Sequence, residues 1–219
     1  MGSVIPSQAE MREALAVRHG QKLQSLLEAA CVAVCGLGGL GSNVAIALAR
    51  AGVGHLQLFD FDRVDISNLN RQQYFVRQLG MNKTDAMREN LAEIAPYCHV
   101  TATQTRLDEE NIPRLLTGAS IIVEAFDKAE AKAMLVNAVL EKFPDAWLVS
   151  GNGMAGLGSA NLICTRRLGR RFLLCGDGIS AIEEGGGLFS ARVLACAAHE
   201  ALAVIKIIAG DFDSPDAKE

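Results

Sequence analysis

The chain has 219 residues, of which 50% are hydrophobic and 21% are charged. This composition supports a buried core and excludes a disordered chain. A formal net charge of −4 without a basic run disfavours nucleic acid as a partner. No apolar run reaches the roughly 18 residues of a membrane helix, and no signal peptide is recognisable. We therefore expect one α/β domain over residues 1–219 in the cytoplasm, with no membrane contact.

The cysteines are scattered and include no C-x-x-C pair. They are Cys31, Cys35, Cys98, Cys164, Cys175 and Cys196. Several lie in apolar runs, where cysteine behaves as a small buried hydrophobic residue. The pattern favours a reducing compartment and argues against a cysteine-rich zinc site, so no zinc is expected.

Residues 7–30 predict a helical segment ahead of the first strand, with Gly20 as a break. Its apolar face consists of Met11, Leu15, Leu23, Leu26 and Leu27. We expect the segment to pack outside the sheet or against a second subunit. Arg12 and Arg18 also lie here, and each alone fits a solvated helix face.

The next stretch predicts a nucleotide-binding element. Residues 32–35 form a short apolar strand, and Gly36, Gly38 and Gly41 follow with the spacing G-x-G-x-x-G before a helix begins. Such glycines allow a tight turn, close approach of phosphate and close helix packing, and the helix N-terminus attracts an anion. The alternative is a glycine turn without a ligand, and the glycines do not identify the nucleotide.

Polar residues follow the second strand, which is predicted at 55–60. Asp60 ends this strand roughly 20 residues after the glycine turn, where an acid can accept hydrogen bonds from ribose. Asp62 and Asp65 come next, and turn chemistry explains them equally well. Residues 67–74 form a polar loop, in which Arg71 suits phosphate oxygens. Asn68 and Asn70 suit either a ligand or a turn.

Two charged residues mark the ends of later elements. Lys83 begins a helix that ends at Pro96. The helix dipole disfavours a lysine at a helix start, so Lys83 is a candidate for contacting an anion. The alternative is a solvated lysine. Asp127 follows the strand at 120–125, at the sheet edge where ligands bind in such folds. It is a candidate Mg²⁺ ligand or the N-cap of a helix at 129–141.

The remaining elements complete a Rossmann-like, doubly wound, mostly parallel sheet. Strands are predicted at 98–103 and 147–150, and a short helix at 108–116. After a glycine-rich loop at 151–158, runs at 161–165 and 171–175 joined by 166–170 predict a hairpin, hence an antiparallel C-terminal extension. A polar segment at 177–187 is expected to be mobile. The last helix, at 188–209, should pack through Leu194, Ala201, Ile205 and Ile208, and the tail at 210–219 should fray.

Together these residues resemble the ThiF/MoeB/HesA family of adenylating enzymes, which are related to ubiquitin-activating enzyme. The resemblance rests on the turn at 36–42, Asp60-Phe61-Asp62, the segment Ser67-Asn-Leu-Asn-Arg-Gln72, Lys83 and Asp127. It extends over about residues 12–210. Residues 153–161 and 175–178 are similar to a short bacterial ThiF-like subgroup linked to thiamine biosynthesis.

The resemblance implies that the chain binds ATP and Mg²⁺. The ATP-binding residues would be Gly36, Gly38, Gly39, Gly41, Asp60, Asp62, Asn68, Asn70, Arg71, Gln72 and Lys83. The glycine turn would hold the nucleotide and Asp60 the ribose. Arg71, Lys83 and Asp127 would carry catalysis, with Asp127 holding Mg²⁺. The organisation implied is one adenylation domain, with a helical segment at 7–30, a nucleotide-binding core at 31–150 and a C-terminal part at 151–210.

The implied reaction is adenylation of the C-terminal carboxylate of a small ubiquitin-like sulfur carrier ending in Gly-Gly, with release of pyrophosphate. Relatives form homodimers in which an N-terminal arginine reaches the partner's nucleotide, here Arg12 or Arg18. Some relatives use a cysteine to receive the carrier or its sulfur. Cys175 is the best candidate for that role, although a cysteine at a strand end is more often inert.

Three other functions remain open. An NAD-dependent oxidoreductase would share the glycine turn and Asp60, but it leaves the polar loop, Lys83 and Asp127 unexplained. Activation of a small molecule or of a carboxylate on tRNA would use the same nucleotide site. A non-catalytic module would keep only the affinity for a nucleotide.

Overall fold

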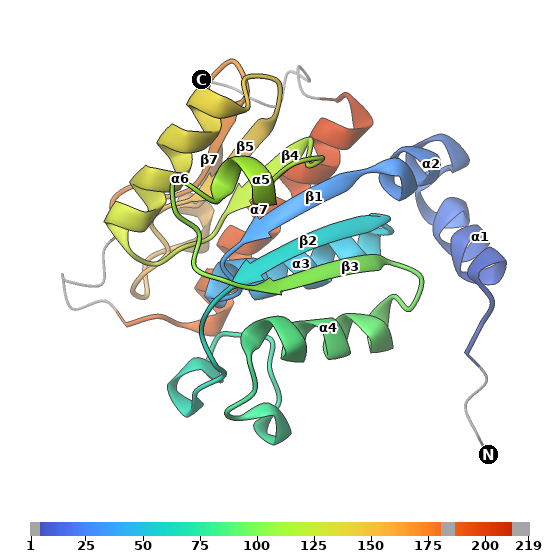
Figure 1. Cartoon of the computed structure of the whole chain (residues 1–219), viewed down its shortest axis with the longest axis horizontal. Coiled ribbons are helices and arrows are strands. Elements are labelled where there is room, and N and C mark those ends of the chain that lie inside the picture. Colours follow the sequence, from blue (N-terminus) through green and yellow to red (C-terminus); the bar gives the residue numbers. More distant parts are fainter. Residues whose placement is uncertain (1–4, 181–186, 212–219) are drawn as a thin grey trace.

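The computed structural model describes residues 5–180 and 187–211 and contains one sheet flanked by helices (Figure 1). The strands are β1 (Cys31–Cys35), β2 (His55–Asp60), β3 (His99–Gln104), β4 (Ile121–Glu124), β5 (Trp147–Gly151), β6 (Cys164–Gly169) and β7 (Phe172–Gly176). Their order across the sheet is β3-β2-β1-β4-β5-β7-β6. All described pairs are parallel except β6 with β7. The predicted Rossmann-like, mostly parallel sheet is confirmed.

Helices cover both faces of the sheet. They are α1 (Gln8–His19), α2 (Gln21–Ala29), α3 (Gly39–Ala51), α4 (Lys83–Ile94), α5 (Ile112–Leu115), α6 (Ala129–Lys142) and α7 (Ser190–Ala209). In Figure 1, α3 and α7 lie behind the sheet and α4 lies below it, whereas α5 and α6 lie in front of it. α4 packs into the same core as α3. This two-layer cover explains why the central strands are apolar on both sides.

Strand alternation divides the interior into two cores. In β1, Val32 and Val34 join the larger core behind the sheet, together with Leu48 of α3. Ala33 and Cys35 point the other way, into the smaller core with Leu135 of α6. Since neighbouring residues of a strand face opposite sides, β1 contributes side chains to both cores, and it is an interior strand of the sheet, between β2 and β4.

The N-terminal segment forms two helices that extend beyond the end of the sheet (Figure 1). Ser7 and Glu10 form a capping box at the start of α1, which is the reciprocal pairing that favours a helix start. Gly20 separates α1 from α2 with φ +91°, a value that suits glycine. The predicted break at Gly20 is confirmed.

The C-terminal part differs from its predicted boundaries. The segment 166–170 was expected to link two strands, but most of it belongs to β6, and a short 3₁₀ helix occupies Ala160–Leu162. The side chains of β6 are mostly exposed because β6 is the edge strand, so it lacks an apolar signature. β7 pairs parallel with β5, which makes only the β6–β7 pair antiparallel.

Two helices also differ from expectation. The short helix predicted at 108–116 is restricted to α5, and α7 begins at Ser190. The predicted packing of Leu194 is wrong, because this side chain is 48% exposed while Val193 and Cys196 are buried. The predicted mobile loop and frayed tail fall partly on residues 181–186 and 212–219, which lie outside the described residues. Among the described helices, none has both the length and the apolar character needed to cross a membrane.

Candidate functional site

A cavity of about 1040 Å³ opens at the carboxyl ends of the central strands. It is lined by the glycine turn, the ends of β2, β4 and β5, the polar loop after β2, and the first turns of α4 and α6. In open parallel sheets this is the edge at which ligands bind, because the strand order reverses there. All predicted nucleotide residues line the cavity except Gly41 and Asn70.

The glycine turn is shaped by close backbone contacts. Gly36 has φ +94°, and a Cβ there would lie 2.8 Å from the carbonyl oxygen of Ala125. A Cβ on Gly41 would lie only 1.8 Å from the oxygen of Gly36, so glycine lets α3 start directly against the turn. At Gly38 nothing lies closer than Gln72 Nε2 at 3.8 Å, which leaves this backbone open to the cavity.

Asp60 fastens the turn from the end of β2. Its Oδ2 accepts the backbone N–H of Leu37 at 2.6 Å, and its Oδ1 accepts that of Asp62 at 2.8 Å. Burial raises the pKa of this carboxyl, which the nearby charge of Lys83 and the two backbone donors oppose. A carboxylate has further lone pairs, so Asp60 can accept additional hydrogen bonds from a ligand.

Lys83 is a buried cation in the wall of the cavity. Its side chain is 6% exposed, and Nζ lies 3.0 Å from Asp62 Oδ2, while Asp62 itself is 51% exposed. The backbone N–H of Lys83 donates to the carbonyl of Asp62, which ties the start of α4 to the end of β2. The solvated lysine considered from the sequence is therefore wrong.

The polar loop holds Arg71 at the rim of the cavity. Arg71 Nη1 donates to the carbonyl of Ser67 at 3.0 Å and to Asn70 Oδ1 at 2.8 Å. Asn70 in turn donates to the carbonyl of Leu188, so its amide joins the loop to the segment before α7 and does not line the cavity. Asn68 does line it, and the buried Oε1 of Gln72 has no hydrogen-bond partner among the described residues.

Asp127 lies at the cavity mouth after β4. It is exposed, and the N-cap position of α6 belongs to Lys128, without a side-chain cap. The capping role considered for Asp127 is therefore not realised. Mg²⁺ is commonly held by one or two carboxylates together with phosphate oxygens and waters. One exposed carboxylate at the mouth of a cavity with an open glycine backbone fits that chemistry, although no group of three or more acidic, histidine or cysteine ligands occurs in the described part of the chain.

Three other candidates lie away from the cavity. Arg12 is engaged within the N-terminal segment, where Nε lies 2.9 Å from Glu28 Oε2. Arg18 is exposed on α1. The side chain of Cys175 is fully buried, and burial raises the pKa of its thiol to about 12. A thiol with so high a pKa is a poor nucleophile.

Lys132, which the sequence analysis did not select, also lines the cavity from α6. Its Nζ donates to Glu124 Oε2 at 2.5 Å and to the carbonyl of Gly151 at 2.9 Å. Glu124 is fully buried and also accepts a hydrogen bond from Ser150. The available signal was Glu124 itself, because an acid at the end of an apolar strand needs a cation nearby.

The chain is similar to known proteins along most of its length. Residues 11–172 match the ThiF family. The chain belongs to this family of adenylating enzymes. It is 32% identical over 195 residues to the molybdopterin-synthase adenylyltransferase of Salmonella typhimurium, covering 85% of this chain and 76% of that protein.

Other ThiF-family relatives carry different names. The tRNA threonylcarbamoyladenosine dehydratase of Escherichia coli is 36% identical over 120 residues, which covers 54% of this chain and 45% of that protein. The adenylyltransferase and sulfurtransferase MOCS3 of Culex quinquefasciatus is 32% identical over 214 residues, which covers 91% of this chain and 46% of that protein. The chain thus spans about half the length of these two relatives.

The fold also matches solved structures. The Escherichia coli dehydratase, determined in complex with ATP, superposes with a TM-score of 0.84 at 23% identity, covering 95% of this chain and 98% of that chain. At this identity the match establishes a shared fold.

Proposed function

We propose that this ThiF-family protein binds ATP with Mg²⁺ and adenylates a carboxylate, releasing pyrophosphate. The observation that carries the proposal is the cavity itself. It combines an open glycine backbone at Gly38 with Arg71, Lys83 and the exposed Asp127 at one sheet edge. Cations and backbone donors at one place suit a polyphosphate better than the nicotinamide end of NAD, which needs neither Lys83 nor Asp127.

The proposed roles follow from these positions. Asp60 would accept the ribose hydroxyls, and Gly36, Gly38 and Gly39 would face the phosphates. Arg71 and Lys83 would neutralise charge that accumulates on the phosphates during transfer. Asp127, with phosphate oxygens, would hold Mg²⁺, which supplies additional charge neutralisation when bound.

The bond changes are those of nucleotidyl transfer. A carboxylate oxygen of the acceptor forms a bond to the α-phosphorus of ATP, and the bond from that phosphorus to the bridging oxygen of pyrophosphate breaks. The products are an acyl-adenylate and pyrophosphate. No protein base is required, because a carboxylate is already ionised at neutral pH. Positioning and electrostatics therefore account for the catalysis proposed.

The acceptor that we favour is the C-terminal Gly-Gly carboxylate of a small ubiquitin-like sulfur carrier, in a pathway such as thiamine biosynthesis. Support comes from the relative named molybdopterin-synthase adenylyltransferase, of which the chain covers the larger share. The similarity of residues 153–161 and 175–178 to thiamine-linked proteins points the same way.

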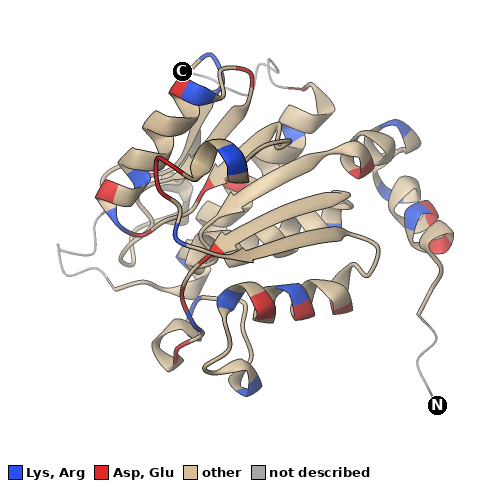
Figure 2. Ribbon diagram, in the orientation of Figure 1, with Lys and Arg blue, Asp and Glu red and all other residues tan. Residues whose placement is uncertain are grey.

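A carboxylate carried on tRNA is the second candidate acceptor. Relatives named tRNA threonylcarbamoyladenosine dehydratase favour it. The overall charge does not, because acidic and basic residues alternate along α1 and α4 (Figure 2) and the net charge is −4, even with the four arginines within residues 166–171. Binding to a tRNA backbone needs a basic surface.

Exchange of labelled pyrophosphate into ATP tests the function directly. The protein is incubated with ATP, Mg²⁺ and either candidate carriers ending in Gly-Gly or tRNA bearing threonylcarbamoyladenosine. Exchange that depends on a carrier is the expected result, and a carrier lacking its last glycine is the control. Exchange with tRNA alone would transfer the assignment to the second acceptor, and tight binding of NAD without binding of ATP would contradict both.

A further inference from the structure

A buried ion pair joins the end of β7 to the first turn of α7. Arg192 Nη2 donates to Asp177 Oδ2, and the two side chains are 6% and 4% exposed. Arg192 lies near the N-terminus of a helix, where the helix dipole disfavours a positive charge. Buried charges are costly unless they are paired and hydrogen-bonded. The position of this pair is therefore unfavourable for Arg192, which prompts the question of what the pair does besides packing.

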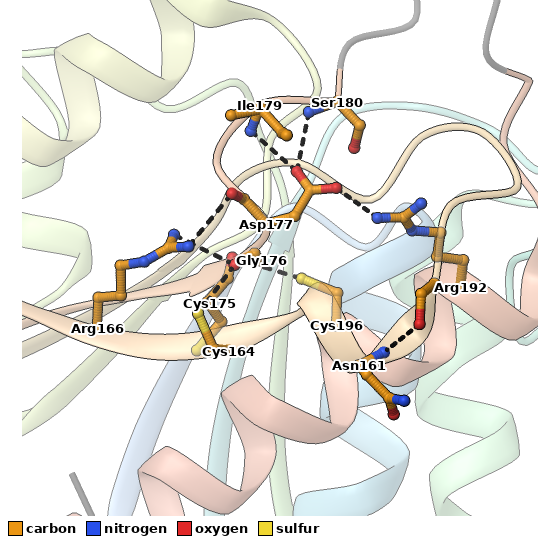
Figure 3. Close-up of polar contacts among 11 residues, drawn as sticks. Asn161, Cys164, Arg166, Cys175, Gly176, Asp177, Ile179, Ser180, Arg192 and Cys196 are labelled. Carbon is orange, nitrogen blue, oxygen red and sulfur yellow. Dashed lines mark hydrogen bonds and ion pairs between the residues drawn. The ribbon is translucent and has the colours of Figure 1, made fainter. Parts of the chain in front are cut away.

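The other oxygen of Asp177 fixes the path of the chain after β7. Its Oδ1 accepts the backbone N–H groups of Ile179 at 2.9 Å and Ser180 at 2.8 Å (Figure 3). Burial alone would raise the pKa of Asp177, but these donors and the charge of Arg192 lower it below its ordinary value. Asp177 is therefore held as a carboxylate that organises the residues around it.

A third side chain reinforces the same segment from the edge strand. Arg166 of β6 donates to the carbonyls of Gly176 at 3.4 Å and Asp177 at 3.3 Å (Figure 3). The segment 176–180 is thus held by side chains from both β6 and α7. Ser180, at the end of this segment, lines the cavity.

The glycine-rich loop after β5 lies directly against the ion pair. A Cβ on Gly153 would lie 2.1 Å from Asp177 Oδ1, and a Cβ on Gly158 would lie 2.4 Å from Arg192 Nη1. The backbone N–H of Asp177 also donates to the carbonyl of Gly153 at 3.0 Å. Residues 152–155 of this loop line the cavity. The position of that wall therefore depends on the ion pair.

This wall and the part of the cavity formed by the glycine turn and Asp60 come from different parts of the sheet. The glycine turn and Asp60 follow β1 and β2, whereas the wall follows β5 and β7, with β4 between the two groups. With the nucleotide placed on the glycine turn and Asp60 as proposed above, this wall remains available to the second substrate.

We propose that Asp177 and Arg192 are a positioning pair that shapes the acceptor side of the cavity. Neither residue lines the cavity, so they act through the backbone at 152–155 and through Ser180. The inference rests on the adenylation proposed above. It requires that loss of the pair impair use of the acceptor more than binding of ATP.

The test compares Asp177→Asn, Arg192→Gln and the conservative Arg192→Lys with the wild type. Asp85→Asn is the matched control, because it removes an exposed ion pair with Arg88 on α4. Carrier-dependent pyrophosphate exchange gives a KM for each substrate. We expect the KM for the carrier to rise at least about tenfold in the first two variants while the KM for ATP stays within about threefold. Arg192→Lys should recover part of the loss.

An equal rise in both KM values, or no rise in either, would overturn the proposal. Hydrogen exchange provides a readout that does not depend on the acceptor. Asp177→Asn should speed amide exchange at 152–158 and 178–180 but not at 36–42, and uniform or absent acceleration would overturn the shaping role. A wild type that binds ATP but shows no exchange with any carrier or with tRNA would contradict the proposed function, and hydrogen exchange would then decide the positioning role separately.

Discussion

Substitution of Arg71 and Asp127 tests whether the protein is an adenylating enzyme or only binds a nucleotide. Both lie at the cavity rim, outside the core. Loss of an interaction that is made mainly in the transition state lowers turnover more than it weakens substrate binding. We expect Arg71→Ala and Asp127→Ala each to reduce pyrophosphate exchange by roughly 10²-fold or more, the scale of losing one electrostatic stabiliser.

Circular dichroism should show that both variants remain folded. Arg77→Ala is the control for Arg71, because Arg77 lies in the same region but packs over the Phe75 ring and does not line the cavity. Exchange rates of Arg71→Ala and Asp127→Ala within a few-fold of the wild type would remove these residues from the catalytic set.

Cys175 offers a second comparison at this scale. Its thiol is buried and its pKa is raised to about 12, chiefly by burial. A thiol that stays protonated at neutral pH is not a ready nucleophile. We expect Cys175→Ala to retain adenylation within a few-fold, with a cost confined to stability. A loss of carrier-dependent product in a variant of unchanged melting temperature would restore a catalytic role for Cys175.

Glu200 makes stability depend on pH. Both of its carboxylate oxygens are buried without hydrogen-bond partners among the described residues, and burial raises its pKa well above the ordinary value. At low pH the group is protonated in both states. As pH rises, the unfolded chain loses this proton while the folded chain keeps it, so the free energy of unfolding falls until the folded pKa is reached.

Glu200→Gln removes that titration. We expect the variant to gain stability over the wild type as pH rises from 5 to 8, by up to about 1.4 kcal/mol per pH unit. Melting curves across this range provide the measurement. Lys132 and Glu124 face the same site, so Glu124→Gln serves as a comparison. A stability difference that does not change with pH would show that Glu200 is ionised in the folded protein.

At the scale of the element, Gly38 and Gly41 have different roles in the glycine turn: we expect Gly38 to serve nucleotide binding and Gly41 to serve the packing of α3. A Cβ on Gly41 would overlap the Gly36 oxygen at 1.8 Å, whereas Gly38 has no neighbour closer than 3.8 Å. We expect Gly41→Ala to destabilise the protein by roughly 1–3 kcal/mol through overpacking, and Gly38→Ala to weaken ATP binding with little change in melting temperature. Calorimetry and thermal melting together check both. Equal effects of the two substitutions on stability would contradict this division.

The elements near the glycine turn could be predicted because their signals are local. An apolar strand, spaced glycines and a helix follow one another within 31–51, and the structure places β1 and α3 there. The antiparallel strand β6 was predicted too early, at 161–165, because an exposed edge strand shows no apolar alternation that would fix its bounds. The parallel pairing of β7 with β5 depends on residues far apart in the chain. Lys132 was missed because a lysine in a helix also fits a solvated face, and it is the burial of Glu124, eight residues earlier, that shows the pairing.

At the scale of the whole molecule, we expect a homodimer related by a two-fold axis. Two short 3₁₀ helices, Ile66–Asn68 and Val76–Gln78, follow β2 and expose apolar side chains, with Ile66 at 73% and Val76 at 72%. Exposed apolar surface of this kind is typical of association sites. Light scattering at micromolar concentration should give about twice the 23.3 kDa of one chain. Ile66→Asp with Val76→Asp should shift the mass towards one chain, and a wild-type mass of one chain would refute the dimer.

The interior position of β1, between β2 and β4, has a consequence for how the chain folds. β1 pairs with β2, which follows it closely, but its other neighbour is β4, with Val32 opposite Ile121. Contacts between residues so distant in sequence form slowly, because a long loop must close first. Until the ribosome has released the chain through Glu124, one edge of β1 has no strand to pair with. The apolar centre of the sheet is therefore completed late, and the newly made chain exposes an unpaired strand edge of the kind that promotes aggregation.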